Sequence, residues 1–256
     1  MRALNRKVTL QVIRKVLKAD FSCEERCFDE EGVFIYQARE VEGRRRFPFS
    51  EKSLFIMTMG RGVVISCSSD RVEWVKENLC SLTRDQIFSA PVIALLEVLV
   101  NKQDQLMAGP DLKYACSADT FRPSKPSDET EVRLVERADV RGFYKHEGFR
   151  HALAYRPDSP RPDVLATVAE YKGKTIGIAG ASADCNEMWQ VGVDVIPDHR
   201  RHGVGKTLVS ELTKAIIRRG KVPYYSTTVS NIQSRALATG LGYWPSWVEL
   251  YAREKR

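Results

Sequence analysis

A junction between a strand and a helix, VIPDHRRHGVGKTLV at residues 195–209, constrains the fold more than any other stretch of this sequence. The strand-like run that enters the junction ends at Pro197, because proline cannot donate a ladder hydrogen bond. A helix is predicted over 203–220, since apolar residues recur there at helical spacing and Gly220 is a natural C-terminal cap. Its apolar face consists of Val204, Leu208, Leu212, Ala215 and Ile216. A strand that leads directly into a helix predicts an α/β layer at this point.

The start of this helix is a predicted anion site, with phosphate the best fit. Its first backbone N–H groups lack helical partners, and the positive end of the helix dipole adds to their effect. Gly203 and Gly205 let the backbone approach an anion closely. Four residues add positive character: Arg200, Arg201, His202 and Lys206. The loop is not a nucleotide-binding P-loop, because position 200 is Arg where that motif has its first Gly, and a tight turn with solvated arginines is the alternative.

Composition places the chain among globular proteins, with 43% apolar and 29% charged residues in 256. No apolar run approaches the roughly 18 residues of a membrane-spanning helix, so we expect no membrane partner. The N-terminal stretch over 1–21 is typical of an amphipathic helix and not of a signal peptide. The net charge of +7 would suit nucleic acid, but the basic residues are dispersed. The dense run over 44–46 is predicted to be a solvated face.

Six scattered cysteines predict reduced thiols and a cytoplasmic protein. Cys23 and Cys27 are four residues apart and fit one helix face. A zinc site usually needs four ligands, and no second Cys or His pair lies near these two in sequence. We therefore expect no metal.

A seam at 117–131, SADTFRPSKPSDETE, divides the chain. The division predicts an N-terminal α/β domain over 1–118, a linker over 119–130 and a C-terminal domain over 131–256. Upstream, helices are predicted over 6–19, 70–79 and 91–100, and strands over 32–39, 53–60, 62–68 and 111–117. Downstream, strands are predicted over 131–137, 163–173, 174–184, 187–197, 222–230 and 246–253, and a second helix follows an N-cap at Asn231. The C-terminal domain is thus a mixed sheet with helices packed on it.

Two motifs in the C-terminal domain resemble the GCN5-related N-acetyltransferase (GNAT) superfamily. The run Arg200-x-x-Gly203-x-Gly205 is similar to the family signature R/Q-x-x-G-x-G/A. The later segment is similar to the family pattern N-x-x-A-x-x-L-Y-x-x-x-G-F through Asn231, Ser234, Leu237, Gly242 and Tyr243. The resemblance covers about residues 131–256. It implies a GNAT-type α/β (α+β) fold, a mostly antiparallel sheet flanked by helices, while the N-terminal domain is compatible with a degenerate copy of the same unit.

The resemblance also implies acetyl-CoA as co-substrate and an amine as acceptor. In this family the fourth strand has a bulge and diverges from the fifth, and pantetheine lies in the gap. The implied edge here is Val193, Asp194 and Val195, and the implied pyrophosphate site extends from Arg200 through Arg201, His202, Gly203, Val204, Gly205 and Lys206 to Thr207. Asn231 and Ser234 of the following helix complete the implied cofactor site.

The catalytic residues are less clear than the cofactor site. The family's usual general acid is the Tyr of N-x-x-A-x-x-L-Y, and this chain has Ala238 there. Four residues nearby in sequence are candidates for the acid, although none falls on the motif position: Ser234, Tyr243, Tyr224 and Tyr225. The alternative role of Ser234 is packing against the cofactor, and Tyr243 can replace the core Phe of the motif. Glu187, at the start of the fourth strand, is a candidate base, acting directly or through water. Its alternative role is a solvated strand-end carboxylate.

The leading prediction is an acyl-CoA-dependent N-acyltransferase that transfers acetyl to a primary amine by direct attack in a ternary complex. A catalytically inactive CoA-binding regulatory protein is the alternative, and Ala238 is its main support. Nucleic-acid binding through the +7 charge is a third hypothesis, and we do not expect it. A homodimer is left open.

Overall fold

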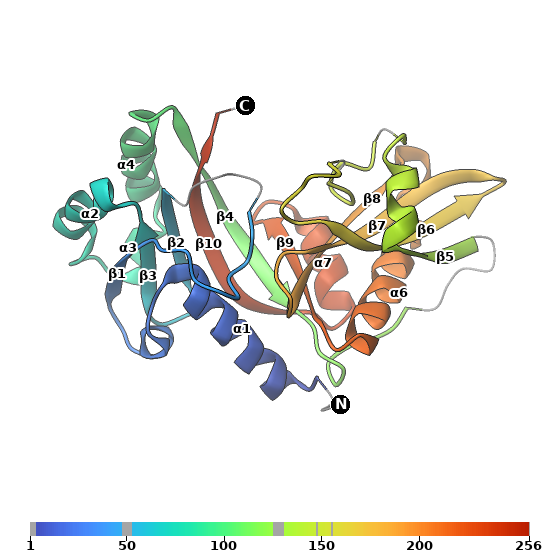
Figure 1. Ribbon diagram of the computed structural model, residues 1–256, viewed down its shortest axis with the longest axis horizontal. Coiled ribbons are helices and arrows are strands. Elements are labelled where there is room, and N and C mark those ends of the chain that lie inside the picture. The colour runs from blue at the N-terminus through green and yellow to red at the C-terminus, as the bar shows by residue number, and fades with distance from the viewer. Residues whose placement is uncertain (1–3, 48–52, 125–130, 147, 155, 256) are drawn as a thin grey trace.

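The computed structural model describes residues 4–47, 53–124, 131–146, 148–154 and 156–255. Within this described part, one mixed sheet of ten strands extends through the whole molecule in the order β1-β3-β2-β10-β4-β9-β8-β7-β6-β5 (Figure 1). The strands are β1 (Val33–Gln37), β2 (Leu54–Thr58), β3 (Val63–Cys67), β4 (Gln105–Ala115), β5 (Glu131–Glu136), β6 (Asp163–Tyr171), β7 (Lys174–Ala183), β8 (Met188–Val195), β9 (Val222–Thr228) and β10 (Trp244–Glu254). Only the β1–β3 and β8–β9 pairs are parallel; the other neighbours are antiparallel. The predicted fold class is confirmed.

Helices cover both faces of the sheet. They are α1 (Arg6–Phe21), α2 (Val72–Leu79), α3 (Arg84–Ile87), α4 (Ala90–Asn101), α5 (Arg137–Val140), α6 (Val204–Arg218) and α7 (Ile232–Gly240). Helices α2 to α4 pack on the N-terminal strands, and α6 and α7 pack on the same face of the C-terminal strands. Helix α1 lies across the middle of the opposite face, where its apolar side chains meet β2, β9 and β10 (Figure 1). Short 3-10 turns are η1 (Glu25–Phe28), η2 (Ser69–Arg71), η3 (Arg141–Phe143) and η4 (Pro197–His199).

Local sequence signals account for most element boundaries. The five residues predicted for the apolar face of α6 are all buried, and Gly220 has the left-handed backbone (φ 70°) that follows a helix end. The predicted hairpin at residues 60–62 joins antiparallel β2 and β3. The predicted turn at Lys172-Gly173 joins β6 and β7, with φ of 49° and 73° at the two residues.

The position of β10 could not be read from the sequence. This last strand lies between β2 and β4, two strands from the N-terminal half of the chain, and pairs with both in antiparallel fashion. Strand β4 in turn pairs with β9 of the C-terminal half, for example Tyr114 with Tyr225. The two halves therefore share one sheet. The predicted division at 119–130 stays a prediction, and residues 125–130 of that linker lie outside the described part.

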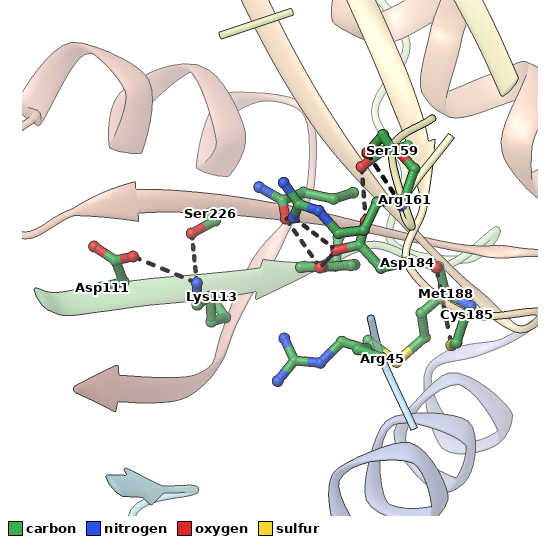
Figure 2. Close-up of polar contacts among 12 residues, drawn as sticks. Arg45, Asp111, Lys113, Ser159, Arg161, Asp184, Cys185, Met188 and Ser226 are labelled. Atoms are coloured by element: carbon green, nitrogen blue, oxygen red, sulfur yellow. Dashed lines mark hydrogen bonds and ion pairs between the residues drawn. The ribbon is translucent and has the colours of Figure 1, made fainter. Parts of the chain in front are cut away.

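A buried ion cluster joins the two halves beneath α1, and it corrects one expectation. Residues 44–46 were expected to form a solvated face, but Arg45 is only 1% exposed. Its guanidinium contacts Asp20 of α1 and Glu249 of β10, and Lys113 of β4 lies 3.3 Å from the same glutamate. Figure 2 shows Lys113 between Asp111 and Ser226, with Arg45 below them. Arg45 is buried because two carboxylates neutralise it, which no local charge pattern reveals.

Candidate functional site

The candidate site lies where β8 and β9 diverge. The two strands pair in parallel from Met188↔Val222 to Val191↔Tyr225. Beyond that rung, β8 continues to Val195 and stays paired with β7, but no pairing with β9 follows among the described residues. The divergence exposes one backbone edge of β8 at the residues predicted to accept pantetheine, 193–195.

The bulge implied by the family resemblance is absent from β8 as described. The β7–β8 register proceeds without a shift from Ala183↔Trp189 to Gly177↔Val195. The expectation of a bulge was therefore wrong, although a divergence of the strands was expected and is present. Gly192 explains the local geometry differently: a Cβ built there would lie 1.8 Å from the carbonyl oxygen of His151. This glycine makes room for another segment.

The segment over 149–153 packs against β7 and β8 beside the divergence. Gly180 of β7 has the same role as Gly192, since a Cβ there would lie 1.9 Å from the carbonyl oxygen of Ala152. The carboxylate of Asp194 accepts hydrogen bonds from the backbone N–H groups of His151, at 2.7 Å, and Ala152, at 3.1 Å. Asp194 thus anchors this segment at the edge of the candidate site.

The N-terminus of α6 faces the same point. Arg201 and Gly203 both have left-handed backbones, with φ of 66° and 81°, and Gly203 is the N-cap without a side-chain capping bond. Since Gly203 has no side chain to accept from the first N–H groups of the helix, these groups are suited to binding an anion. Arg200 is oriented differently: its Nε donates to the carbonyl oxygen of Val195 at 2.8 Å and ties the loop to the end of β8. Arg201, His202 and Lys206 are exposed around the helix start.

Three elements converge at Gly205. A Cβ built on this glycine would lie 3.5 Å from Val195, 3.6 Å from Leu237 of α7 and 3.9 Å from Val193. The helix start, the free part of β8 and α7 are therefore within contact distance of one another. Asn231 caps α7 as predicted, because its side chain accepts from the backbone N–H of Ser234 at 3.1 Å.

The structure does not bring all predicted site residues together. Residues 193–195 meet the start of α6 at Gly205, and Leu237 of α7 lies beside the same point. Asn231 and Ser234 lie at the start of α7. Glu187 lies before the other end of β8, some six residues or about 20 Å along the strand from Val193, and its carboxylate pairs with Lys15 of α1 at 2.9 Å. Tyr243 is buried, and its hydroxyl lies 2.6 Å from the Thr213 hydroxyl of α6. A catalytic role for Glu187 or Tyr243 stays a prediction.

The sequence makes Tyr224 and Tyr225 equal candidates for the acid, and the structure separates them. Tyr225 is on the last β8–β9 rung, on the face that α6 and α7 cover. Burial raises the pKa of its hydroxyl, a hydrogen bond from Ser234 opposes the rise, and the charge of Asp194 adds to it. The alternation of side chains in a strand was the available signal: Tyr224 and Tyr225 must face opposite sides, so only one of them lies with α6 and α7.

The described residues contain neither a metal-binding cluster nor a membrane-spanning helix. No group of three or more His, Cys, Asp or Glu side chains in that part of the chain is arranged to hold a metal ion. Within the same residues, every helix is too short or too polar to cross a membrane.

The chain is similar to several solved structures and to one family model. A GCN5-related N-acetyltransferase-like protein from Streptococcus suis is 17% identical, with a TM-score of 0.47 over 64% of this chain and 69% of its own. A Drosophila protein is 12% identical, with a TM-score of 0.47 over 98% of this chain and 90% of its own. The aminoglycoside N-acetyltransferase AAC(6')-Iy, solved in complex with CoA, is 20% identical, with a TM-score of 0.36 over 48% of this chain and 93% of its own. No curated protein matches the sequence. The acetyltransferase (GNAT) family model matches residues 131–243, and the C-terminal half of this chain is therefore a GNAT acetyltransferase domain.

Proposed function

We propose that this protein is an acyl-CoA-dependent N-acyltransferase, which transfers acetyl from acetyl-CoA to a primary amine by direct attack in a ternary complex. The observation that carries the proposal is the convergence of two features within a GNAT domain. The β8 edge at 193–195 has no partner strand on the β9 side among the described residues, and the N-terminus of α6 lies against it at Gly205.

The residues around the divergence suit the parts of CoA. The N–H groups at the start of α6, with Arg201, His202 and Lys206, would bind the pyrophosphate. Val193, Asp194 and Val195 would pair with pantetheine through their backbone, and a β8 N–H group would stabilise the developing oxyanion. The thioester supplies an activated acyl group, so the protein mainly has to align the amine and manage protons.

The acceptor would enter from the face opposite α6 and α7. There the segment over 149–153, anchored by Asp194, borders the divergence, and the N-terminal domain would help to shape the cleft. We further propose a cytoplasmic protein, in keeping with six unpaired cysteines. The identity of the amine and a homodimer are matters for experiment.

The first test is thermal unfolding with acetyl-CoA, with free CoA, and with 3′-phospho-ADP, which lacks the pantetheine arm. A ligand at one hundred times its Kd stabilises the folded state by about 2.7 kcal/mol. That corresponds to a rise in Tm of roughly 5–10 °C for a domain of this size. We expect acetyl-CoA and CoA to give this rise and 3′-phospho-ADP to give less.

Gly203→Val is the matching variant, and Gly173→Val is its control. Both glycines have similar left-handed backbones, with φ of 81° and 73°, and both have open space where a Cβ would lie. The two substitutions should therefore cost similar stability, about 1–2 kcal/mol. Only Gly203→Val should abolish the rise with acetyl-CoA. If acetyl-CoA gives the wild type no rise, the proposal is wrong.

A CoA-binding regulatory protein without catalysis is the second candidate, and Ala238 favours it. This residue stands where the family's general acid would be, and it is fully buried. The two candidates differ in thiol release: the enzyme should release CoA in the presence of an amine, and the regulatory protein should bind acetyl-CoA without turnover.

A further inference from the structure

The missing tyrosine on α7 raises the question of which group protonates the departing thiolate. Ala238 is on the buried face of α7, and its side chain has no polar atom. Three tyrosines from neighbouring strands reach the same core: Tyr114 of β4, Tyr225 of β9 and Tyr243 just before β10. Only a hydroxyl that lies beside the free edge of β8 can reach a thiol bound there.

The hydroxyl groups of two of these tyrosines have other side-chain partners. The Tyr243 hydroxyl lies 2.6 Å from the Thr213 hydroxyl of α6. The Tyr114 hydroxyl accepts from Nε of Arg235 on α7 at 3.3 Å. Tyr224, next to Tyr225 in sequence, points to the opposite face, where its hydroxyl donates to Asp184 and Gln190.

Tyr225 differs from these residues in its position. It occupies the last rung before β8 and β9 separate, opposite Val191, so its ring stands at the base of the divergence. Its side chain is buried on the face that α6 and α7 cover, and Ser234 of α7 and the charge of Asp194 both affect the pKa of its hydroxyl. The ring is held edge to face against Tyr243, with 6.2 Å between the ring centroids. The side chain thus belongs to the core that the free part of β8, α6 and α7 share beside the proposed pantetheine path.

We propose that Tyr225 is the general acid of the acyl transfer, with Ser234 positioning its hydroxyl; this rests on the function proposed above. As the acceptor nitrogen forms its bond to the acyl carbon, the carbon–sulfur bond breaks and the sulfur takes the proton of the Tyr225 hydroxyl. The tyrosinate regains a proton from water through the Ser234 hydroxyl. The proton that the amine loses passes to solvent, so the products are the amide and CoA thiol.

The protonation state of Tyr225 agrees with this role. Burial and the charge of Asp194 raise the pKa of its hydroxyl above the ordinary value, so the group is protonated at neutral pH. Ser234 opposes the rise through its hydrogen bond, which stabilises the tyrosinate formed after proton transfer. Tyr225 thus retains its proton before the reaction, and Ser234 stabilises the tyrosinate that proton transfer leaves.

The test compares Tyr225→Phe with Tyr114→Phe, a matched control from the directly opposite position on β4. CoA release from acetyl-CoA is followed with a panel of primary amines: a simple alkylamine, an amino acid, a polyamine, an aminoglycoside and a lysine peptide. Loss of a general acid typically lowers the rate about 100-fold or more. We expect that loss in kcat for Tyr225→Phe, with KM for acetyl-CoA and the thermal shift unchanged, and wild-type turnover for Tyr114→Phe. Ser234→Ala should lose about tenfold through the same step.

A second measurement separates proton donation from packing. Acetyl-seleno-CoA, in which selenium replaces the sulfur, retains the pantetheine and pyrophosphate of CoA, and its selenolate leaves without a proton, so wild type and Tyr225→Phe should use it at equal rates. A purely structural defect would slow both donors alike, and that result would overturn the proposal. It would equally be overturned if Tyr225→Phe turned over acetyl-CoA within twofold of wild type, or if Tyr243→Phe gave the leaving-group-dependent loss instead.

If the wild type binds acetyl-CoA without releasing CoA, the proposed function fails and this inference fails with it. If the wild type turns over normally and Tyr225→Phe is unaffected, the inference alone is overturned.

Discussion

Replacing Glu249 with glutamine tests how strongly the buried ion cluster holds the last strand in the N-terminal half of the sheet. Glu249 of β10 is 1% exposed and lies between Arg45 and Lys113. Burial by itself raises the pKa of this carboxyl, but the charges of Arg45 and Lys113, with hydrogen bonds from Arg45 and Trp247, outweigh it. The net effect lowers the pKa from 4.5 to about 2.

The lowered pKa of Glu249 determines how much its ionised carboxylate stabilises the fold, and over which pH range. A lowering from 4.5 to about 2 corresponds to roughly 3 kcal/mol of stability. Because the folded-state pKa is the lower one, this stability is fully present above pH 4.5 and is lost as the pH falls towards 2. Removing one partner from a buried ion cluster typically costs about 3–5 kcal/mol, which agrees with the value from the pKa.

Urea unfolding at pH 7 and pH 3, followed by tryptophan fluorescence, measures the prediction. Glu249→Gln should lower the free energy of unfolding by about 3 kcal/mol at pH 7. At pH 3 the difference in this free energy between variant and wild type should be smaller by about 2 kcal/mol. Glu170→Gln is the control, because the Glu170–Arg133 pair is partly exposed and should contribute less than about 1 kcal/mol. An equal difference in the free energy of unfolding at both pH values would refute the electrostatic reasoning. A difference below about 1 kcal/mol at pH 7 would show that the cluster contributes little net stability.

Two further predictions concern residues that border the candidate site. Gly192→Ala should destabilise the fold by at least roughly 2 kcal/mol, because the new Cβ would lie 1.8 Å from the His151 carbonyl oxygen; thermal unfolding measures this, and a neutral result would mean that the segment over 149–153 does not pack on β8. Thr213→Val should cost about 1–3 kcal/mol by leaving the buried Tyr243 hydroxyl without its 2.6 Å partner. Adding Tyr243→Phe should then restore part of that loss in a double-mutant cycle, and strictly additive effects would argue against the hydrogen bond.

Local signals explain why the strands, helices and cofactor motif could be predicted. The turn at Lys172-Gly173, the cap at Asn231 and the apolar face of α6 each depend on residues a few positions apart. The strand-to-helix junction is of the same kind, since the strand end at Pro197 and the glycines of the helix start are adjacent in sequence. Interactions within about one turn of the chain are the ones that a sequence displays directly.

The roles of several residues could not be predicted because they depend on distant partners. Position 192 has no room for a Cβ because the carbonyl oxygen of His151, forty-one positions earlier, lies against it. Glu187 was a candidate base because it begins the strand predicted to border the cofactor, yet β8 and β9 diverge at the other end of that strand. Which of the tyrosines faces the proposed pantetheine path follows from strand pairing between β4, β8 and β9, and no spacing in the sequence reports it.

The sequence by itself determined the elements of the C-terminal half, their order, and the motif that joins β8 to α6. The tertiary structure alone decided that β10 inserts between β2 and β4, that Arg45 is buried between two carboxylates, and that Tyr225 stands where β8 and β9 separate. The physical reason is the range of the forces. Turns, caps and helical periodicity act between near neighbours, whereas strand insertion and the pairing of buried charges join residues that are far apart, as in the pair Arg45 and Glu249, 204 positions apart.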